Sequence, residues 1–221
     1  ERINWAANRV DVVMECTGIF TDAEQASVHL RGGAKKVLVS APSKGADLTV
    51  VFGVNHNLIS SEHKIISNAS CTTNCLAPIA YILDKLCGIK QGFMTTIHSY
   101  TGDQRLLDTE HKDLYRSRAA ALNMIPTTTG AAKAVGLVLP KLDGKLDGVA
   151  IRVPTPNVSA VDFVFQPSRN TSAKEINQLI ENAAKSELRG VLDFTDQELV
   201  SSDFNHHPAS SIVHLDQTRV M

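Results

Sequence analysis

The chain has 221 residues, enough for one large domain or two small ones with their own cores. Lys and Arg total 22 against 23 Asp and Glu, and this formal net charge of -1 excludes a general nucleic-acid binder and an acidic disordered tail. Four cysteines at irregular spacing exclude a disulfide framework, and no apolar run approaches the roughly 18 residues that cross a bilayer. We therefore expect a cytoplasmic protein without a membrane partner.

The first third of the sequence alternates short β-branched runs with a helical stretch. Residues 10–16 are valine-rich and end at a Thr-Gly turn, and Thr21-Asp22 offers an N-cap for a helix over residues 23–30. Strand, helix, strand with short connections is typical of a parallel sheet covered by helices, whose ligands collect at the carboxyl ends of the strands. Further strands are predicted at 36–40, 48–52 and 64–67, and the candidate ligand-binding ends are Thr17-Gly18, Ser40-Ala41 and Asn68-Ala69-Ser70.

The rest of the sequence has a different pattern, and we expect a domain boundary near Ser70. Residues 72–87 carry apolar side chains at helical spacing, with Pro78 expected in the first turn or at a kink. Residues 100–123 are polar and too long for an ordinary connection, and long ordered loops are usually functional. Strands at 93–97, 148–154 and 159–165, with helices from Thr129-Gly130 to 138 and at 172–186, predict an α+β domain.

The segment SNASCTTNCLAP, residues 67–78, is the most informative for chemistry. Cys71 follows a predicted strand end and falls at the start of a helix, where backbone N–H groups and the helix dipole lower a thiol's pKa and can hold an oxyanion or a phosphate. From the residues alone, an inert buried Cys71 is an equal alternative, because reduced cysteine is among the most buried residue types. Cys75 is expected to be structural, and a zinc site of Cys71, Cys75 and His98 lacks a fourth ligand.

This segment resembles the active-site signature of the phosphorylating glyceraldehyde-3-phosphate dehydrogenase family. The resemblance continues through HSYTGDQ, RSRAAALNMIPTTTGAAKAVG, IRVPTPNVSAVD and DFNHHPASSIV and covers essentially the whole chain. It implies an α/β fold in which residues 1–70 are the C-terminal part of a Rossmann-type NAD-binding domain and residues 71–221 are an α+β catalytic domain. It also implies NAD-dependent oxidative phosphorylation of D-glyceraldehyde 3-phosphate to 1,3-bisphosphoglycerate, through a thioester on Cys71.

The resemblance also identifies a catalytic base, His98, at the end of the predicted strand MTTIHS. An imidazole beside the thiol stabilises the thiolate and takes the proton of the hydroxyl on the attacked carbon. On sequence alone seven other histidines compete for this role. Five are expected on the surface, one lies in a predicted helix and one lies near the end of the chain: His56, His63, His111, His206 and His207, then His29, then His214.

Two anion sites are implied by the resemblance, one for the phosphate of the substrate and one for inorganic phosphate. The first consists of Thr101, Asp103 and Arg152, because a guanidinium offers fixed paired donors to a phosphate. A structural ion pair of Arg152 with Asp147 or Asp162 is the alternative.

The site for inorganic phosphate is implied at the start of the second predicted helix of the catalytic domain. An ordinary N-cap at Thr129 is compatible with that role. The residues implied are Ser70, Thr72, Arg116, Thr129 and Gly130.

NAD is the expected cofactor, although the sequence contains no G-x-G-x-x-G motif. Thr109-Glu110 stands where strictly NAD-using bacterial members of the family tend to have Leu-Pro. A carboxylate there repels the extra phosphate of NADP, so NAD remains favoured. The resemblance implies that five residues at strand ends line the cofactor cleft, each of which is equally explained as part of a plain turn: Thr17, Gly18, Phe20, Ser40 and Ala41.

The sequence also bears on the ends of the chain and on its oligomeric state. Glu1 is not a methionine and residues 1–20 carry no leader, so we expect a chain interior that lacks both ends of the family's sequence. The loop over residues 100–123 resembles the family's segment that packs between subunits, which implies a homotetramer.

Two other functions remain open. Erythrose-4-phosphate dehydrogenase shares the cysteine segment but lacks the Tyr-Thr-Gly and Thr-Gly-Ala-Ala motifs that are present here. A truncated chain without catalytic activity that binds a partner through an exposed sheet edge is the second alternative.

Overall fold

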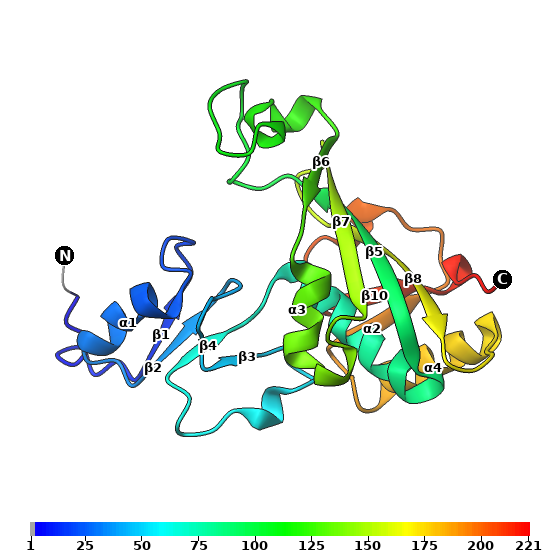
Figure 1. The fold of residues 1–221 in the computed structure, drawn as a ribbon, viewed down its shortest axis with the longest axis horizontal. Helices are drawn as coiled ribbons and strands as arrows, with labels where there is room; N and C mark the ends of the chain where they lie inside the picture. The colour runs from blue at the N-terminus through cyan, green and yellow to red at the C-terminus, as the bar shows by residue number, and fades with distance from the viewer. Residues whose placement is uncertain (1–2) are drawn as a thin grey trace. The chain divides into compact units, whose positions relative to one another are not determined.

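The computed structural model describes residues 3–221, and the chain divides into two compact units, Glu1–Asn74 and Cys75–Met221. The first unit contains a parallel sheet in the strand order β1-β2-β4-β3 (Figure 1). Its strands are β1 (Val12–Glu15), β2 (Lys36–Val39), β3 (Leu48–Thr49) and β4 (Ile65–Ser67). The parallel sheet predicted for this region is confirmed.

Helix α1 (Ala23–Arg31) connects the first two strands and covers the sheet. It begins at Asp22, whose carboxylate accepts a hydrogen bond from the Gln25 amide at 2.9 Å. Its buried face places Ala26 against Val37 and other apolar side chains of the sheet, and burial of this apolar surface stabilises the unit.

Two strands of this unit are shorter than predicted. The run over 10–16 is a strand only from Val12 to Glu15, and the run over 48–52 only from Leu48 to Thr49. The second run ends early because the Val51 amide donates to the Asn55 side chain at 2.8 Å, which turns the chain away from β4.

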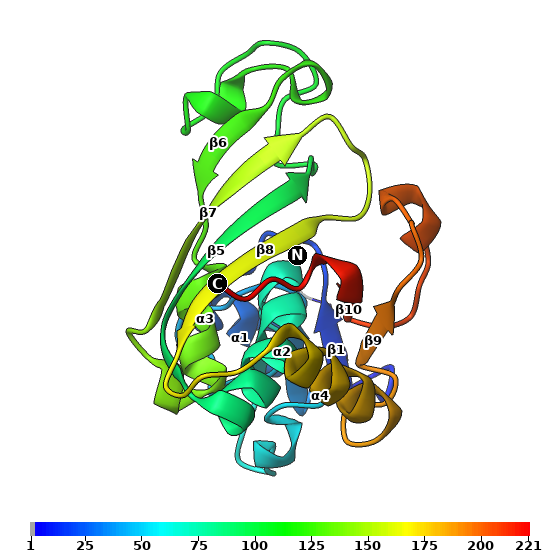
Figure 2. The same ribbon diagram turned by 90° about the vertical axis from the view of Figure 1, so that its right-hand side faces the viewer.

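The second unit is built on a mixed sheet in the order β6-β7-β5-β8, whose strands lie side by side in Figure 2. Its strands are β5 (Ile89–Ser99), β6 (Ile125–Thr128), β7 (Leu146–Val153) and β8 (Ala160–Pro167). The central pair β5 and β7 is parallel, whereas β8 and β6 are antiparallel to their neighbours. This mixture of parallel and antiparallel pairs agrees with the α+β architecture expected after Ser70.

Three helices accompany this sheet: α2 (Cys71–Cys87), α3 (Ala131–Val138) and α4 (Ala173–Lys185). Pro78 lies in the middle of α2, so its predicted place in a first turn is wrong. The helix continues through the proline because Leu76, Ile82 and Leu83 are buried, and this packing offsets the roughly 3 kcal/mol that an internal proline costs.

Sequence reasoning did not find three strands. They are β6 and the parallel pair β9 (Leu192–Thr195) and β10 (Ser211–His214). Each has only four residues, and β6 carries Pro126, which suits its edge position but weakens its pattern in the sequence. Partners that are distant in sequence, not local propensity, define these strands.

The long loop after β5 is irregular, as predicted. Between Ser99 and Ile125 its only helical turns in the described structure are short 3-10 turns at Tyr115–Ser117 and Ala120–Leu122. Over residues 3–221 no helix has the length and apolar character that a bilayer span requires.

Candidate functional site

Cys71 is exposed and is the first residue of α2. The chain reaches it from β4 by a sharp turn in which Ala69 has a φ of 56°, a conformation that L-residues rarely adopt. Ser70 then caps the helix, because its hydroxyl accepts from the Thr73 amide at 3.0 Å. The prediction of a buried Cys71 is therefore wrong, whereas neighbouring Thr72 is buried.

The strand ends of the first unit meet at one edge of its sheet, as predicted. The Ser40 amide donates to the Glu15 carbonyl at 3.0 Å, and the Asn68 amide donates to the Val39 carbonyl at 2.9 Å. The Ser67 hydroxyl donates to the Ala41 carbonyl at 2.8 Å. The Thr17-Gly18 turn, the Ser40-Ala41 turn and the start of α2 thus occupy one region of the unit.

A buried pair, Glu15 and His29, supports the Thr17-Gly18 turn. Glu15 accepts from the Thr17 amide at 2.8 Å and from the Thr17 hydroxyl. The indole of Trp5 donates to His29 Nδ1 at 3.2 Å, so the neutral ring carries its proton on Nε2, which lies 2.7 Å from the Glu15 carboxylate. Phe20 meets the same ring edge-on, with a centroid distance of 5.8 Å. Sequence reasoning missed Glu15 and placed His29 only in a helix.

His98 lies near the end of β5 and is 8% exposed. Its Nδ1 is 2.6 Å from the Ser99 carbonyl oxygen, which can only accept. The proton of the neutral ring is therefore on Nδ1, and Nε2 carries the lone pair that a general base needs.

Arg152 is the register partner of His98 on the neighbouring strand β7. Its Nη1 donates to the Thr101 hydroxyl at 2.9 Å and to the Gln104 amide oxygen at 3.3 Å. The structure therefore brings Arg152 and Thr101 together, as predicted, and adds Gln104. Asp147 forms an ion pair with Lys133 at 3.5 Å.

Asp103 contacts Arg116, a residue predicted for the other phosphate site. Its Oδ2 accepts from Arg116 Nη1 at 2.7 Å, and His111 Nε2 is 3.5 Å from its Oδ1. Burial alone would raise the pKa of Asp103, but hydrogen bonds from Arg116 and His111 outweigh burial and hold the pKa below its usual value. Two residues that were predicted for separate phosphate sites are thus in direct contact.

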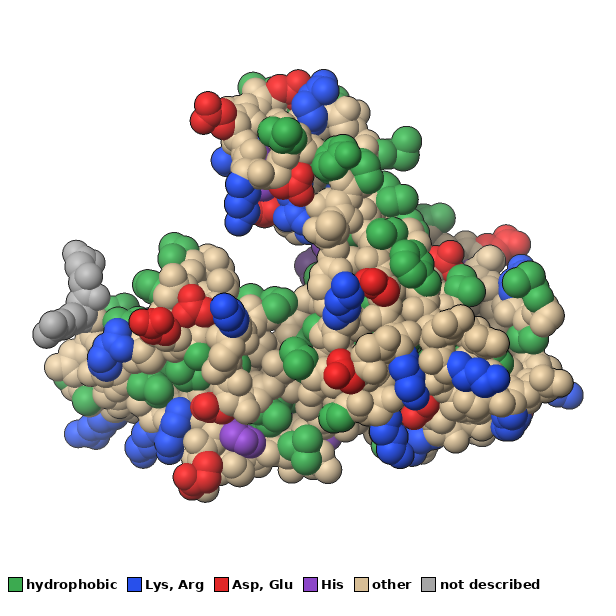
Figure 3. All heavy atoms as spheres, viewed as in Figure 1, with side chains coloured by type: hydrophobic (Ala, Val, Ile, Leu, Met, Phe, Trp, Pro, Cys, Tyr) green, Lys and Arg blue, Asp and Glu red, His purple; other side chains and the backbone are tan. Residues whose placement is uncertain are grey.

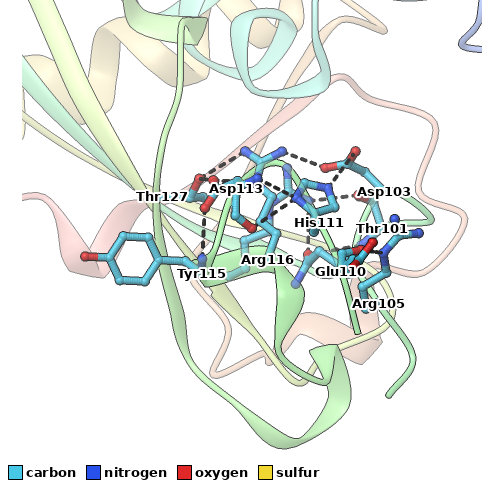
Figure 4. Close-up of polar contacts among 11 residues, drawn as sticks. Thr101, Asp103, Arg105, Glu110, His111, Asp113, Tyr115, Arg116 and Thr127 are labelled. Carbon is cyan, nitrogen blue, oxygen red and sulfur yellow. Dashed lines mark hydrogen bonds and ion pairs between the residues drawn. The ribbon is translucent and has the colours of Figure 1, made fainter. Parts of the chain in front are cut away.

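Five residues form what we call the Arg116 cluster: Asp103, His111, Asp113, Arg116 and Thr127 (Figure 4). The Thr127 hydroxyl accepts from Arg116 Nε at 3.2 Å and Nη2 at 3.0 Å, and donates to the Asp113 carboxylate at 3.1 Å. The prediction of a solvated His111 is wrong, because the folded loop leaves its side chain only 6% exposed. The run Pro-Thr-Thr-Thr-Gly before α3 was the available signal for Thr127.

Thr129 and Gly130 precede α3, and Thr129 is not the N-cap residue that the sequence suggested. Gly130 is the N-cap residue, and the Thr129 hydroxyl accepts from the Ala131 amide at 3.2 Å. Thr129 therefore lies one residue before the N-cap, and its side chain stabilises the turn that leads into α3.

Comparison with known proteins places these residues in a family. Residues 70–221 match the family model described as glyceraldehyde 3-phosphate dehydrogenase, C-terminal domain. A glyceraldehyde-3-phosphate dehydrogenase of Xanthobacter flavus is 66% identical over 96% of this chain and 63% of its own length. Proteins of the same name from Cereibacter sphaeroides and Zymomonas mobilis are 65% and 59% identical, over 98% and 96% of this chain and 65% and 64% of their own lengths.

The chain thus spans a little less than two thirds of the length of these curated relatives. The identity at this level extends over nearly all of the chain, and the family model matches more than half of it. Together these two findings establish the family. The chain belongs to the glyceraldehyde-3-phosphate dehydrogenase family.

Proposed function

We propose that the protein containing this chain oxidises D-glyceraldehyde 3-phosphate with NAD and phosphorylates the product to 1,3-bisphosphoglycerate. The observation that carries the proposal is the 66% identity to a relative of that name, combined with an exposed Cys71 at a helix start. Residues 1–70 then belong to the NAD-binding domain and residues 71–221 to the catalytic domain.

In the proposed mechanism, Cys71 attacks the aldehyde carbon as a thiolate and forms a thiohemiacetal. The N-terminus of α2 favours the anionic sulfur and the developing oxyanion. His98, with its lone pair on Nε2, accepts the hydroxyl proton while the carbon is oxidised to a thioester. Inorganic phosphate then attacks the thioester carbonyl, the C–S bond breaks, and the acyl phosphate leaves.

The two phosphate groups need separate cationic sites in this reaction. Arg152 with Thr101 suits the phosphate of the substrate, because Arg152 is the register partner of His98 on β7 and its guanidinium contacts Thr101, which follows the strand of His98. Arg116 suits inorganic phosphate, with Ser70, Thr72, Thr129 and Gly130 as the further proposed contacts.

The cofactor NAD, which accepts a hydride when bound, suits the strand-end edge of the first unit. The proposed contacts at this edge are Thr17, Gly18, Phe20, Ser40 and Ala41, in the segments that follow β1 and β2. The buried hydroxyl of Ser43, in the same loop as Ala41, lacks a partner among residues 3–221, as expected for a group that serves a ligand.

Self-association also belongs to the proposal. The sheet of the second unit exposes Phe93, Val149 and Val164, which register pairing places on one face of β5, β7 and β8. The space-filling view shows apolar side chains exposed over this part of the unit (Figure 3). Apolar faces of this kind mark protein interfaces, and we propose a homotetramer.

The decisive experiment replaces Cys71 by Ser in the full-length protein. A serine hydroxyl at neutral pH is a far weaker nucleophile, so we expect phosphate-dependent NAD reduction to fall by about a thousandfold or more. Cys75→Ser is the matched control and should retain activity, since a serine hydroxyl can keep the polar contact that the Cys75 thiol makes with the Ser211 hydroxyl at 3.6 Å.

Rates on glyceraldehyde 3-phosphate and erythrose 4-phosphate in the same assay identify the substrate. A Cys71→Ser protein that keeps wild-type dehydrogenase activity would overturn the proposal.

A further inference from the structure

Arg116 is oriented by its neighbours and still has donors left for an anion. Thr127 takes the Nε hydrogen and one Nη2 hydrogen, and Asp103 takes one Nη1 hydrogen. A guanidinium has five N–H groups, so two have no protein partner within residues 3–221. The side chain is 19% exposed, which leaves a restrained pair of donors accessible to a phosphate.

His111 is the buried member that anchors this arrangement. The Asp113 amide donates to His111 Nδ1 at 2.9 Å, and an amide N–H can only donate, so the neutral ring carries its proton on Nε2. The Asp113 carbonyl oxygen, 3.0 Å from Nδ1, accepts from the ring when it is doubly protonated. In both the neutral and the doubly protonated ring, Nε2–H faces Asp103 Oδ1.

The carboxylate that His111 faces is half exposed, in contrast to the ring. The Asp103 side chain is 47% exposed, and a carboxylate in such a place is free to turn toward water unless a neighbour holds it. One oxygen of Asp103 meets His111 and the other meets Arg116. Thr127 and Asp113 hold the Nε side of the guanidinium, and Asp103, which contacts His111, holds Nη1.

We propose that His111 is a positioning residue of the inorganic-phosphate site, holding Asp103 so that Asp103 orients Arg116. This role rests on the function proposed above. Without the Nε2–H of His111, Asp103 and Arg116 must be ordered when phosphate binds, and that ordering weakens phosphate affinity.

Two substitutions separate this role from a purely structural one. His111→Asn places an amide oxygen near the former Nδ1, so it keeps the bond from the Asp113 amide and loses the contact with Asp103. His111→Gln places an amide N–H near the former Nε2, so it keeps the donor to Asp103. A positioning role predicts damage in the Asn variant and rescue in the Gln variant, whereas a structural role predicts the reverse order.

The measurements are made on the full-length protein with inorganic phosphate as the probe. Calorimetry gives the phosphate dissociation constant without turnover, and steady-state rates give KM for phosphate, KM for the aldehyde, and kcat. We expect phosphate binding roughly threefold to tenfold weaker in His111→Asn, with KM for the aldehyde unchanged, and a value within about twofold of wild type in His111→Gln. His56→Asn is the control, since His56 Nδ1 also accepts a backbone amide, from Gly53 at 3.1 Å, but outside the cluster.

The outcomes distinguish this inference from the proposed function. Equal phosphate affinity in wild type and His111→Asn, or a Gln variant weaker than the Asn variant, overturns the positioning role alone. A wild-type protein that binds phosphate but does not reduce NAD contradicts the proposed function alone. A wild-type protein that binds no phosphate contradicts both.

Discussion

At the scale of single residues, the buried Glu15 shows how burial and hydrogen bonding compete. Burial would raise the pKa of Glu15, but hydrogen bonds from Thr17 and His29 outweigh it and lower the pKa below its ordinary value. The carboxylate is 3% exposed and remains charged because three donors surround it. The ionised Glu15 therefore stabilises the first unit and the turn proposed to contact NAD.

The sign of the resulting pH dependence follows from this lowered pKa. The stabilisation of the folded state by ionised Glu15 is fully present above the unfolded-state pKa of about 4.5. It is lost as the pH falls through the folded-state pKa of Glu15. We expect the difference in unfolding free energy between wild type and Glu15→Gln to be largest above about pH 4.5 and to shrink below it. Trp5, the single tryptophan and a partner of His29, reports this unfolding by fluorescence.

The control for this prediction is Glu62→Gln, because the Glu62 carboxylate is exposed and accepts a hydrogen bond from the neighbouring Ser61 hydroxyl at 3.1 Å. This variant should track wild type at every pH. Parallel pH curves for wild type and Glu15→Gln would show that Glu15 carries no such linkage.

At the scale of elements, the close contact between β5 and β7 positions the second unit's chemistry. The two strands pair in parallel register, which sets His98 opposite Arg152 and Met94 opposite Gly148. A Cβ added at Gly148 would overlap the carbonyl oxygen of Met94 on β5. Because that atom belongs to the backbone, the strands themselves would have to separate.

Gly148→Ala therefore tests the strand pairing. We expect a loss of about 1 to 3 kcal/mol in the unfolding free energy, measured by denaturant titration, and a raised KM for the aldehyde as Arg152 shifts. Gly102→Ala is the matched control, since an added Cβ there meets no atom within 4 Å. Equal stability of the two variants would mean that the sheet accommodates the methyl group without strand displacement.

At the scale of the whole molecule, the exposed apolar face of the sheet is the feature that needs a partner. Phe93 and Val164 are register partners and are 48% and 61% exposed. Such side chains on adjacent strands are unfavourable in water, and a second copy of the protein would bury them.

A charge on this face should disrupt assembly. We expect Val164→Asp in the full-length protein to weaken self-association by at least about tenfold, seen by light scattering as a smaller mass at equal concentration. Val200→Asp, at a residue 63% exposed outside the sheet, is the control and should leave the mass unchanged. An unchanged mass for Val164→Asp would exclude this face as the interface.

The extent of sequence prediction differs between the two units. Local patterns were sufficient for α1, α4 and the strands of the first unit, because caps such as Asp22 and Ser172 and valine-rich runs act within a few residues. They failed for β6, β9 and β10, which are short and are defined by partners far along the chain.

Prediction of the candidate site also succeeded for local motifs and failed for contacts between distant segments. The sequence by itself determined the family and the helix start that bears Cys71, since these depend on local motifs, and the family resemblance implied that Thr101 and Arg152 share a site. Only the tertiary structure decided that Asp103 contacts Arg116, that His111 is buried beneath it, and that Glu15 carries the Thr17 turn. Side-chain contacts across an irregular loop or between a strand and a helix have no sequence period, so three-dimensional packing alone specifies them.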